Sequence, residues 1–164
     1  MESMLVWTLT VGVGATVCMD AWALLRRKLF GTPLPNYRFV GRWLAHLVRG
    51  RFRHASIAAS APVRNEALIG WTAHYLIGCA FAGLLIALVG PAWLHRPTLA
   101  PALAVGIGTV AAPLLILQPG MGAGLAARRT PNPNAARLQS LVNHAVFGAG
   151  LYAAGWLASA LVAT

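Results

Sequence analysis

Three ionisable side chains stand inside apolar segments, and they are the residues of this 164-residue chain that could do chemistry. Asp20, His74 and His144 each lie in a run of about 20 mostly apolar residues, the length that crosses a bilayer as a helix. A charge at the bilayer centre costs about 2.5 to 3.5 kcal/mol even on insertion scales, so such groups face the bundle interior. A carboxylate and two imidazoles predict a proton relay or a site for a small polar ligand.

The same three side chains leave other interpretations open. One acid and two histidines are also a set found at metal sites with open positions. His74 and His144 could instead be the axial ligands of haem, with nearby glycines making room for the porphyrin. In a purely structural interpretation, Asp20 pairs with a histidine or an arginine and the other histidine bonds a neighbouring helix. The cofactor is therefore unknown from the sequence, with metal or haem as candidates.

These groups are expected at a common depth in the membrane. Each lies about 9 to 12 Å inside the end of its helix, at 1.5 Å per residue. Pro113 falls at a similar level in another apolar segment, where it removes a backbone hydrogen bond and frees the carbonyl of Thr109. We expect a polar layer here, with Gln118 and Asn143 at its edge.

Four apolar segments must position this layer, at about residues 4–25, 67–89, 98–117 and 138–162. Three of them carry small or polar residues at every fourth position, which places these residues on one helix face. Small residues let helices approach closely, so we expect an all-α membrane protein with four transmembrane helices in a bundle. The stripes are Thr8, Gly12, Thr16 and Asp20; Gly70, His74, Gly78 and Ala82; and Ser140, His144, Gly148 and Tyr152.

The composition supports a membrane protein and sets its orientation. The chain is 58% hydrophobic and 10% charged, against about 25% charged in soluble domains, so the net charge of +10 does not indicate a nucleic-acid binder. Nine of the 13 basic residues lie between the first two segments, three lie between the last two, and Arg96 is on the other side. The positive-inside rule predicts cytoplasmic loops at 26–66 and 118–137 and both termini outside the cytoplasm of a bacterial inner membrane.

The sequence also gives expectations for domain count, the first segment, the cysteines and an internal repeat. The chain reads as a single transmembrane domain over residues 1–164. Glu2 replaces the basic start of a signal peptide, so the first segment is expected to be a mature helix. Cys18 and Cys79 lie in apolar stretches and are expected to be small buried residues, not a disulfide. His74 and Gly78 match His144 and Gly148 in spacing, which suggests a parallel two-helix repeat.

The first long loop carries an amphipathic pattern. Val40, Trp43, Leu44, Leu47, Val48 and Phe52 recur at helical spacing, with basic residues between them. The pattern predicts a short helix on the inner membrane surface, with Arg42, Trp43, Arg49 and Arg53 facing anionic lipid. A docking surface for a partner is the alternative.

The second loop combines glycines with arginines. Backbone N–H groups of Gly120, Gly122 and Gly124 could form a nest for an anion, and Arg128 and Arg129 would add charge. The expected ligand is a lipid headgroup phosphate or a phosphorylated metabolite, although no P-loop spacing is present. A simple tight turn is the alternative.

Several motifs resemble those of an uncharacterised bacterial integral membrane family, catalogued as domain of unknown function 2938. The resemblance covers nearly the whole chain and implies a small bacterial membrane protein, but no activity, substrate or cofactor. The motifs are Gly14-Ala15-Thr16, Met19-Asp20-Ala21-Trp22, Val40-Gly41-Arg42-Trp43, Gly70-Trp71, His74-Tyr75, Gln118-Pro119-Gly120-Met121-Gly122 and Thr130-Pro131-Asn132-Pro133.

Three functions follow from these patterns. The first is a small transporter or channel-like subunit that binds or moves a proton, metal ion or small ligand at the polar layer, and four helices predict a homo-oligomer for this task. The second is a bis-histidine haem or metal redox protein, and the third is a non-catalytic protein that binds lipid or a partner. An enzyme is not favoured, because no paired carboxylates occur and Ser56 and Ser60 near His54 are expected to be loop residues.

Overall fold

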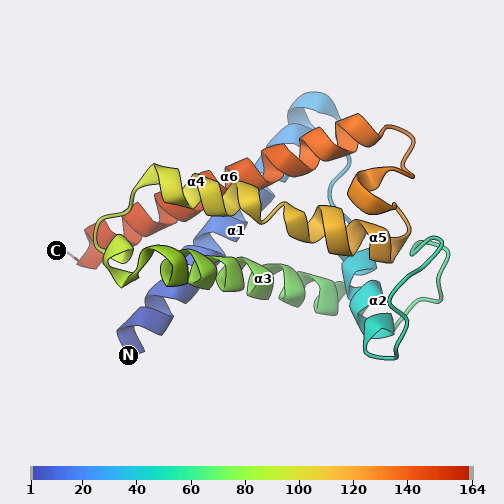
Figure 1. Ribbon diagram of the computed structural model, residues 1–164, viewed down its shortest axis with the longest axis horizontal. Helices are drawn as coiled ribbons and strands as arrows, with labels where there is room; N and C mark the ends of the chain where they lie inside the picture. Colours follow the sequence, from blue (N-terminus) through green and yellow to red (C-terminus); the bar gives the residue numbers. More distant parts are fainter. Residues whose placement is uncertain (1, 163–164) are drawn as a thin grey trace. The chain divides into compact units, whose positions relative to one another are not determined.

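The computed structural model describes residues 2–162, and within this range the chain is all helical, without strands (Figure 1). In chain order its elements are α1 (Glu2–Phe30), α2 (Tyr37–Leu47), α3 (Glu66–Val89), the 3-10 helix η1 (Pro91–Leu94), α4 (Leu99–Gly108), the π-helical turn η2 (Pro113–Leu117), α5 (Gln118–Met121), the 3-10 turn η3 (Leu125–Ala127) and α6 (Pro133–Val162).

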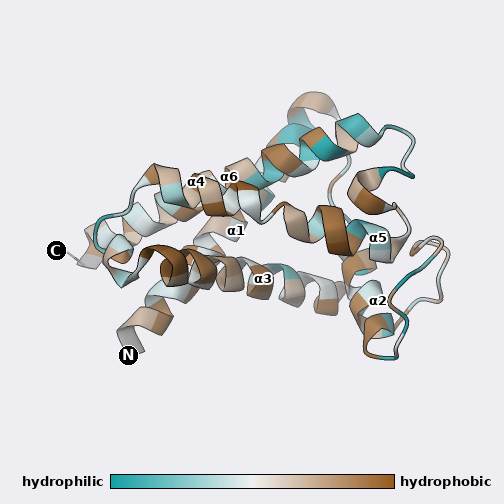
Figure 2. Ribbon diagram, viewed as in Figure 1, coloured by the Kyte–Doolittle hydropathy of each residue, from teal (hydrophilic) through white to brown (hydrophobic). Residues whose placement is uncertain are grey.

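Four helical stretches are long and apolar enough to cross a membrane, which confirms the four predicted segments. They are Met4–Phe30, Glu66–Val89, Leu99–Met121 and Pro133–Leu161. Figure 2 shows α3 mostly in the brown of hydrophobic residues, whereas the first turns of α6 are teal. The first helix continues to Phe30 and the last begins at Pro133, beyond the predicted limits, because arginine and lysine are good helix formers and can extend their long stems toward a polar boundary.

Glycine and asparagine set several helix ends. Gly31 follows α1 with a φ of +65° and its N–H donates to the carbonyl of Arg27, a backbone conformation that favours glycine. The side chain of Asn36 accepts from the N–H of Arg38 and caps α2. The side chain of Asn132 accepts from the N–H of Ala135 in the same way at the start of α6.

The third apolar segment is interrupted where its proline was expected to disturb it. Regular α-helix stops at Gly108, and a π-helical turn begins at Pro113. The N–H of Leu114 still donates to the carbonyl of Val110. A proline has no N–H to continue the helical ladder, and the wider turn adapts the remaining bonds to that gap.

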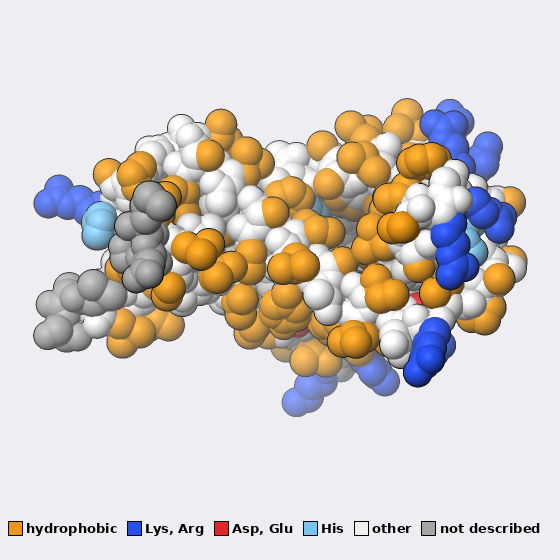
Figure 3. Space-filling model, turned by 90° about the horizontal axis from the view of Figure 1, so that it is seen from below, with side chains coloured by type: hydrophobic (Ala, Val, Ile, Leu, Met, Phe, Trp, Pro, Cys, Tyr) orange, Lys and Arg blue, Asp and Glu red, His pale blue; other side chains and the backbone are white. Residues whose placement is uncertain are grey.

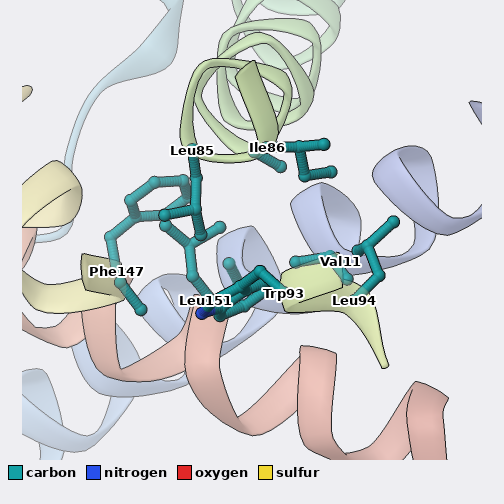
Figure 4. Close-up of a cluster of buried hydrophobic side chains, with 10 residues drawn as sticks. Val11, Leu85, Ile86, Trp93, Leu94, Phe147 and Leu151 are labelled. Carbon is teal, nitrogen blue, oxygen red and sulfur yellow. The ribbon is translucent and has the colours of Figure 1, made fainter. Parts of the chain in front are cut away.

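The chain forms two compact units, and two of the four boundaries between them lie within α3 and α6. The first unit comprises Met1–Leu34, Tyr75–Thr109 and Val142–Thr164, and the second comprises Pro35–His74 and Val110–Leu141. Figure 4 shows the core of the first unit, where side chains of α3 and α6 such as Leu85, Phe147 and Leu151 converge. The single transmembrane domain and the internal repeat both stay predictions.

Close helix contacts in the first unit occur at the predicted small residues. A Cβ on Gly78 would overlap the hydroxyl of Thr16, and a Cβ on Gly12 would overlap the backbone of Cys79. Gly106 and Gly148 place α4 against α6 in the same way. These contacts confirm that small residues let four helices pack together, as expected where lipid supplies no hydrophobic drive for association.

Most of the remaining surface is apolar. Figure 3 shows mainly orange hydrophobic side chains on the face in view, with blue Lys and Arg groups projecting from it. Large residues such as Leu5, Leu76, Leu88 and Trp156 are exposed on the helices. Such an exterior suits contact with lipid and not with water.

Candidate functional site

Asp20 lies in α1, inside a membrane-spanning stretch, and has a defined partner. Its Oδ2 accepts a hydrogen bond of 2.9 Å from the hydroxyl of Tyr75, which stands on α3. Both residues belong to the first unit. Tyr75 was not among the predicted site residues. Its position beside His74 in an apolar helix was the available signal, since a phenol there needs a partner.

His144 is buried between α6 and α4 within the same unit. Its Nδ1 lies 3.0 Å from the hydroxyl of Thr109 and 3.2 Å from the carbonyl of Gly106. The hydroxyl of Thr109 itself donates to that carbonyl at 2.7 Å. A carbonyl can only accept, so this network assigns the ring proton to Nδ1 and keeps Nε2 as the basic nitrogen.

His74 belongs to the second unit and sits in an aromatic stack. Its ring lies 4.1 Å from that of Tyr37, centre to centre and nearly parallel, and 5.9 Å from that of Trp71. The start of α2 reaches this place because Gly70 brings α3 against the carbonyl of Tyr37. Tyr37 and Trp71 were also missed as site residues, because their neighbourhood depends on the contact between α2 and α3.

The predicted metal site and haem site both stay predictions. Among residues 2–162, no three His, Cys, Asp or Glu side chains are grouped so that they could hold a metal ion. Asp20 and His144 belong to the first unit and His74 to the second. The space beside the glycines that were expected to make room for haem is filled by other parts of the protein. Thr16 fills the space at Gly78, and the backbone of α4 fills it at Gly148.

Gln118 and Asn143, the expected edge of the polar layer, are only partly satisfied. The Nε2 of Gln118 donates to the hydroxyl of Ser140 at 3.3 Å in the second unit. The Oε1 of Gln118 and the Oδ1 of Asn143 are buried, without hydrogen-bond partners among the described residues. Gln118 and Asn143 fall in different units, so a shared edge stays a prediction.

Arg42 corrects the expectation of a lipid-facing arginine. It is buried, and its Nε and Nη2 donate to the two oxygens of Glu66 at 2.8 and 2.9 Å. Its Nη1 donates to the carbonyls of Ile57, Ala58 and Ser60. The hydrogen bond to Glu66 raises the pKa of the guanidinium. The sequence pattern missed this role because Glu66 is 24 residues away in the chain.

Glu66 collects further donors at the start of α3. Arg38 contacts its Oε1 through Nη2 at 3.0 Å, and the N–H of Val63 donates to its Oε2 at 3.1 Å. These bonds tie α2, the loop before α3 and α3 itself into one network. A buried carboxylate with this many donors is chiefly a structural element.

The other interfacial residues are also placed differently. The ring of Trp43 is buried, and its Nε1 donates to the carbonyl of Phe52 at 3.1 Å. Helix α2 ends at Leu47, so Arg49 and Arg53 lie beyond it and are exposed. The prediction of a short amphipathic helix is confirmed. Its buried face packs within the second unit, to which α2 belongs, because ion pairing and aromatic packing outweigh the simple apolar pattern.

Two histidines meet beside this network. The rings of His46 and His54 lie 5.0 Å apart, edge to face, and both residues are buried. His46 Nε2 bonds the carbonyl of Ala61, and His54 Nδ1 bonds the hydroxyl of Ser60 at 2.9 Å. Burial lowers the pKa of His54, and the charges of His46 and Arg51 lower it further. Ser60 itself donates to the carbonyl of Ser56, so these contacts hold the loop together.

The glycine turn closes helix α5 and uses one of the N–H groups expected to bind an anion. Gly122 has a φ of +99°, its N–H donates to Pro119, and the N–H of Ala123 donates to Gln118. This pair of bonds is the Schellman ending of a helix, which occupies the N–H of Gly122. Gly120 faces the ring of Trp43 instead.

Arg128 and Arg129 follow this turn and remain exposed. Their side-chain stems flank Gly124, which has a φ of +77°. Binding of an anion by these two side chains alone stays a prediction. Of the predicted backbone donors, the N–H of Gly122 is used in ending the helix, and a role for the others stays a prediction.

Comparison with known proteins gives a family but no activity. A family model described as a protein of unknown function, DUF2938, matches residues 9–158. No curated protein matches the chain. No solved structure matches it either.

Proposed function

We propose, from the premise that this chain belongs to the DUF2938 family of proteins of unknown function, that it is a multi-pass membrane protein that binds and moves a proton at Asp20. The observation that carries this proposal is the hydrogen bond from the hydroxyl of Tyr75 to the carboxylate of Asp20. It gives an acid within a membrane-spanning helix a fixed, polar partner.

The chemistry of the pair suits reversible protonation. A phenol keeps its proton near neutral pH and so remains a donor to the ionised carboxylate. When the carboxyl takes up a proton, it becomes a donor itself and the bond must rearrange. Ionisable groups in membrane helices mark proton pathways in many transporters, and His144 offers a second titratable group in the same unit.

The setting follows from charge and length. We place the protein in a bacterial inner membrane with both termini outside the cytoplasm, because the basic residues concentrate in the two loops assigned to the inside. Anionic lipid at the inner surface is the expected partner of the exposed arginines of these loops. Four spans leave little room for a complete pathway, so a homo-oligomer belongs to this proposal.

The test is proton flux through reconstituted vesicles. Vesicles that contain the protein and an internal pH-sensitive dye should collapse an imposed pH gradient faster than empty vesicles, and Asp20→Asn should abolish the difference. Tyr75→Phe should change the rate because it removes the donor. Thr10→Val is the matched control, since the hydroxyl of Thr10 bonds only the carbonyl of Val6 in its own helix.

Infrared spectroscopy separates binding from movement. The native protein should show a carboxyl band that appears on acidification and is missing in Asp20→Asn. If the titrating band is unchanged in Asp20→Asn, Asp20 is not the group that binds the proton and the proposal fails. If the band is lost but native vesicles leak no faster than empty ones, movement is refuted.

A further inference from the structure

Arg26, in α1, is a buried guanidinium without a partner. Only 8% of the residue is exposed, and its Nε and Nη2 have no hydrogen-bond acceptor among the described residues. Arginine stays protonated in proteins, so neutralisation cannot relieve this charge. A charge in this position requires an anion.

The unpartnered edge has the shape of an oxyanion site. Arg42 uses the same two atoms, Nε and Nη2, to hold both oxygens of Glu66. This edge of a guanidinium matches a carboxylate or a phosphate, two oxygens to two donors. Arg26 therefore presents, in the first unit, the half of the pair that Glu66 completes for Arg42 in the second.

No acidic side chain in the described part of the chain pairs with Arg26. It contains three acidic residues, Glu2, Asp20 and Glu66. Glu66 is held by Arg42 and Arg38, and Asp20 accepts from Tyr75. Glu2 begins the same helix as Arg26, about 36 Å away at 1.5 Å per residue. The anion must come from outside the chain.

Helix register brings other unpartnered polar groups to the same level. Helices α1 and α6 run antiparallel where they touch, because Gly14 meets Ala154 and Gly150 meets Ala15. From the contact of Ala15 with Gly150, Trp22 lies seven residues later on α1, and Asn143 lies seven residues earlier on α6. A shift of seven residues is close to two turns, so each residue stays on the same face of its helix.

Trp22 and Asn143, like Arg26, each have a buried polar atom without a hydrogen-bond partner in the described part of the chain. The Nε1 of Trp22 and the Oδ1 of Asn143 are buried without hydrogen-bond partners among residues 2–162. Arg26 lies four residues, or one turn, beyond Trp22 on α1. Three unsatisfied polar side chains thus fall together at the basic end of the α1 and α6 contact, although buried polar atoms are nearly always paired.

We propose that Trp22, Arg26 and Asn143 form a phosphate-binding site. The guanidinium edge of Arg26 takes two phosphate oxygens, and the indole N–H of Trp22 donates to another. The side-chain amide of Asn143 keeps nearly the same shape when a half-turn exchanges its oxygen and nitrogen. In that orientation its N–H₂ is directed toward the anion. Arg26 lies about 6 Å before Phe30, the last residue of its membrane-spanning stretch, which is the depth of phospholipid headgroups.

The ligand is a phosphate monoester or diester, supplied either by an anionic phospholipid or as a free anion. The test uses the full chain, purified in detergent and stripped of lipid. One arm adds phosphatidylglycerol and counts retained lipid by native mass spectrometry. The other adds inorganic phosphate and follows the Arg Nε–H signals by NMR. Binding in the first arm alone identifies a lipid headgroup, and binding in the second identifies a free anion, and either supports the site.

Variants decide whether the site is Arg26. Arg26→Gln should weaken binding about tenfold or more, the value of a bidentate charged pair. Arg27→Gln is the matched control, because it removes the same charge from an exposed neighbour, and it should bind within about twofold of the native chain. Arg26→Lys keeps the charge but loses the two parallel N–H donors of the guanidinium, so its affinity should lie between those of Arg26→Gln and Arg27→Gln.

Trp22→Phe provides a second test that preserves packing. It removes one donor and should weaken binding several-fold, so the proposal stays testable if Arg26→Gln does not fold. Absence of binding in both arms would overturn the proposal. Equal losses in Arg26→Gln and Arg27→Gln would also overturn it, because they would show only a general attraction to positive charge.

Discussion

At the scale of the residue, Arg42 and Glu66 show how much one buried pair can hold. Arg42→Gln leaves the Glu66 carboxylate buried with fewer donors and frees the carbonyls of Ile57, Ala58 and Ser60. We expect the melting temperature to fall by several degrees, measured by circular dichroism in detergent. Arg49→Gln, on an exposed side chain, should leave it within error. Equal effects of the two changes would contradict a structural role for the buried pair.

His54 should make its loop sensitive to acid. Its pKa is lowered in the folded state, so below the ordinary value of about 6.5 the unfolded loop binds a proton more readily than the folded one. Stability contributed by neutral His54 is therefore complete above that pH and is lost as the pH falls below it. The amides of His54 and Ile57 donate to the carbonyls of Gly120 and Met121. Hydrogen exchange should show that the protection of these two amides falls as the pH is lowered.

The control for this prediction removes the titration but keeps the size. His54→Gln should flatten the pH dependence of those two amides between about pH 5 and 7. Ser60→Ala should leave the pH dependence unchanged and lower protection at every pH, because it removes the hydrogen bonds of the hydroxyl with His54 Nδ1 and with the carbonyl of Ser56 but no titratable group. An unchanged acid response in His54→Gln would assign the effect to another group.

At the scale of the element, glycines decide how closely α4 and α6 can pack. A side chain at Gly148 would meet the backbone of Ala102 and Leu103, which cannot move aside cheaply. Gly148→Leu should separate the helices, lower thermal stability markedly and displace His144 from Thr109. Gly108→Ala is the control, because nothing lies within 4 Å of a Cβ there. Its cost should be small, since alanine favours helices.

At the scale of the whole molecule, orientation is the property to test. Charge asymmetry predicts both termini outside the cytoplasm. Alkaline phosphatase fused after Thr164 should be active, whereas green fluorescent protein at the same place should be dark. Fusions in the loop near Arg51 should give the opposite pair. An inactive phosphatase at the C-terminus would refute the predicted topology.

The amino-acid sequence alone determined the class and the four spans, although α1 and α6 extend beyond their predicted limits. Apolar length, small-residue stripes and prolines act locally, within a turn or a segment, so the effect of Pro113 could be interpreted without a fold. The helix of the first loop was visible for the same reason. Its ending at Leu47 was missed because apolar spacing continues to Phe52, although the hydrogen bonds do not.

Only the tertiary structure decided the partners of polar groups. Glu66 is 24 residues from Arg42, and Tyr75 is 55 residues from Asp20, so neither pair leaves a local pattern. The glycine turn suggested an anion nest because the sequence shows which N–H groups are present but not which acceptors they find. In the structure, the N–H of Gly122 donates to a carbonyl at the end of α5. Arg26 is the converse case. Its charge was counted from the first as a mark of orientation, and only burial without a partner singled it out.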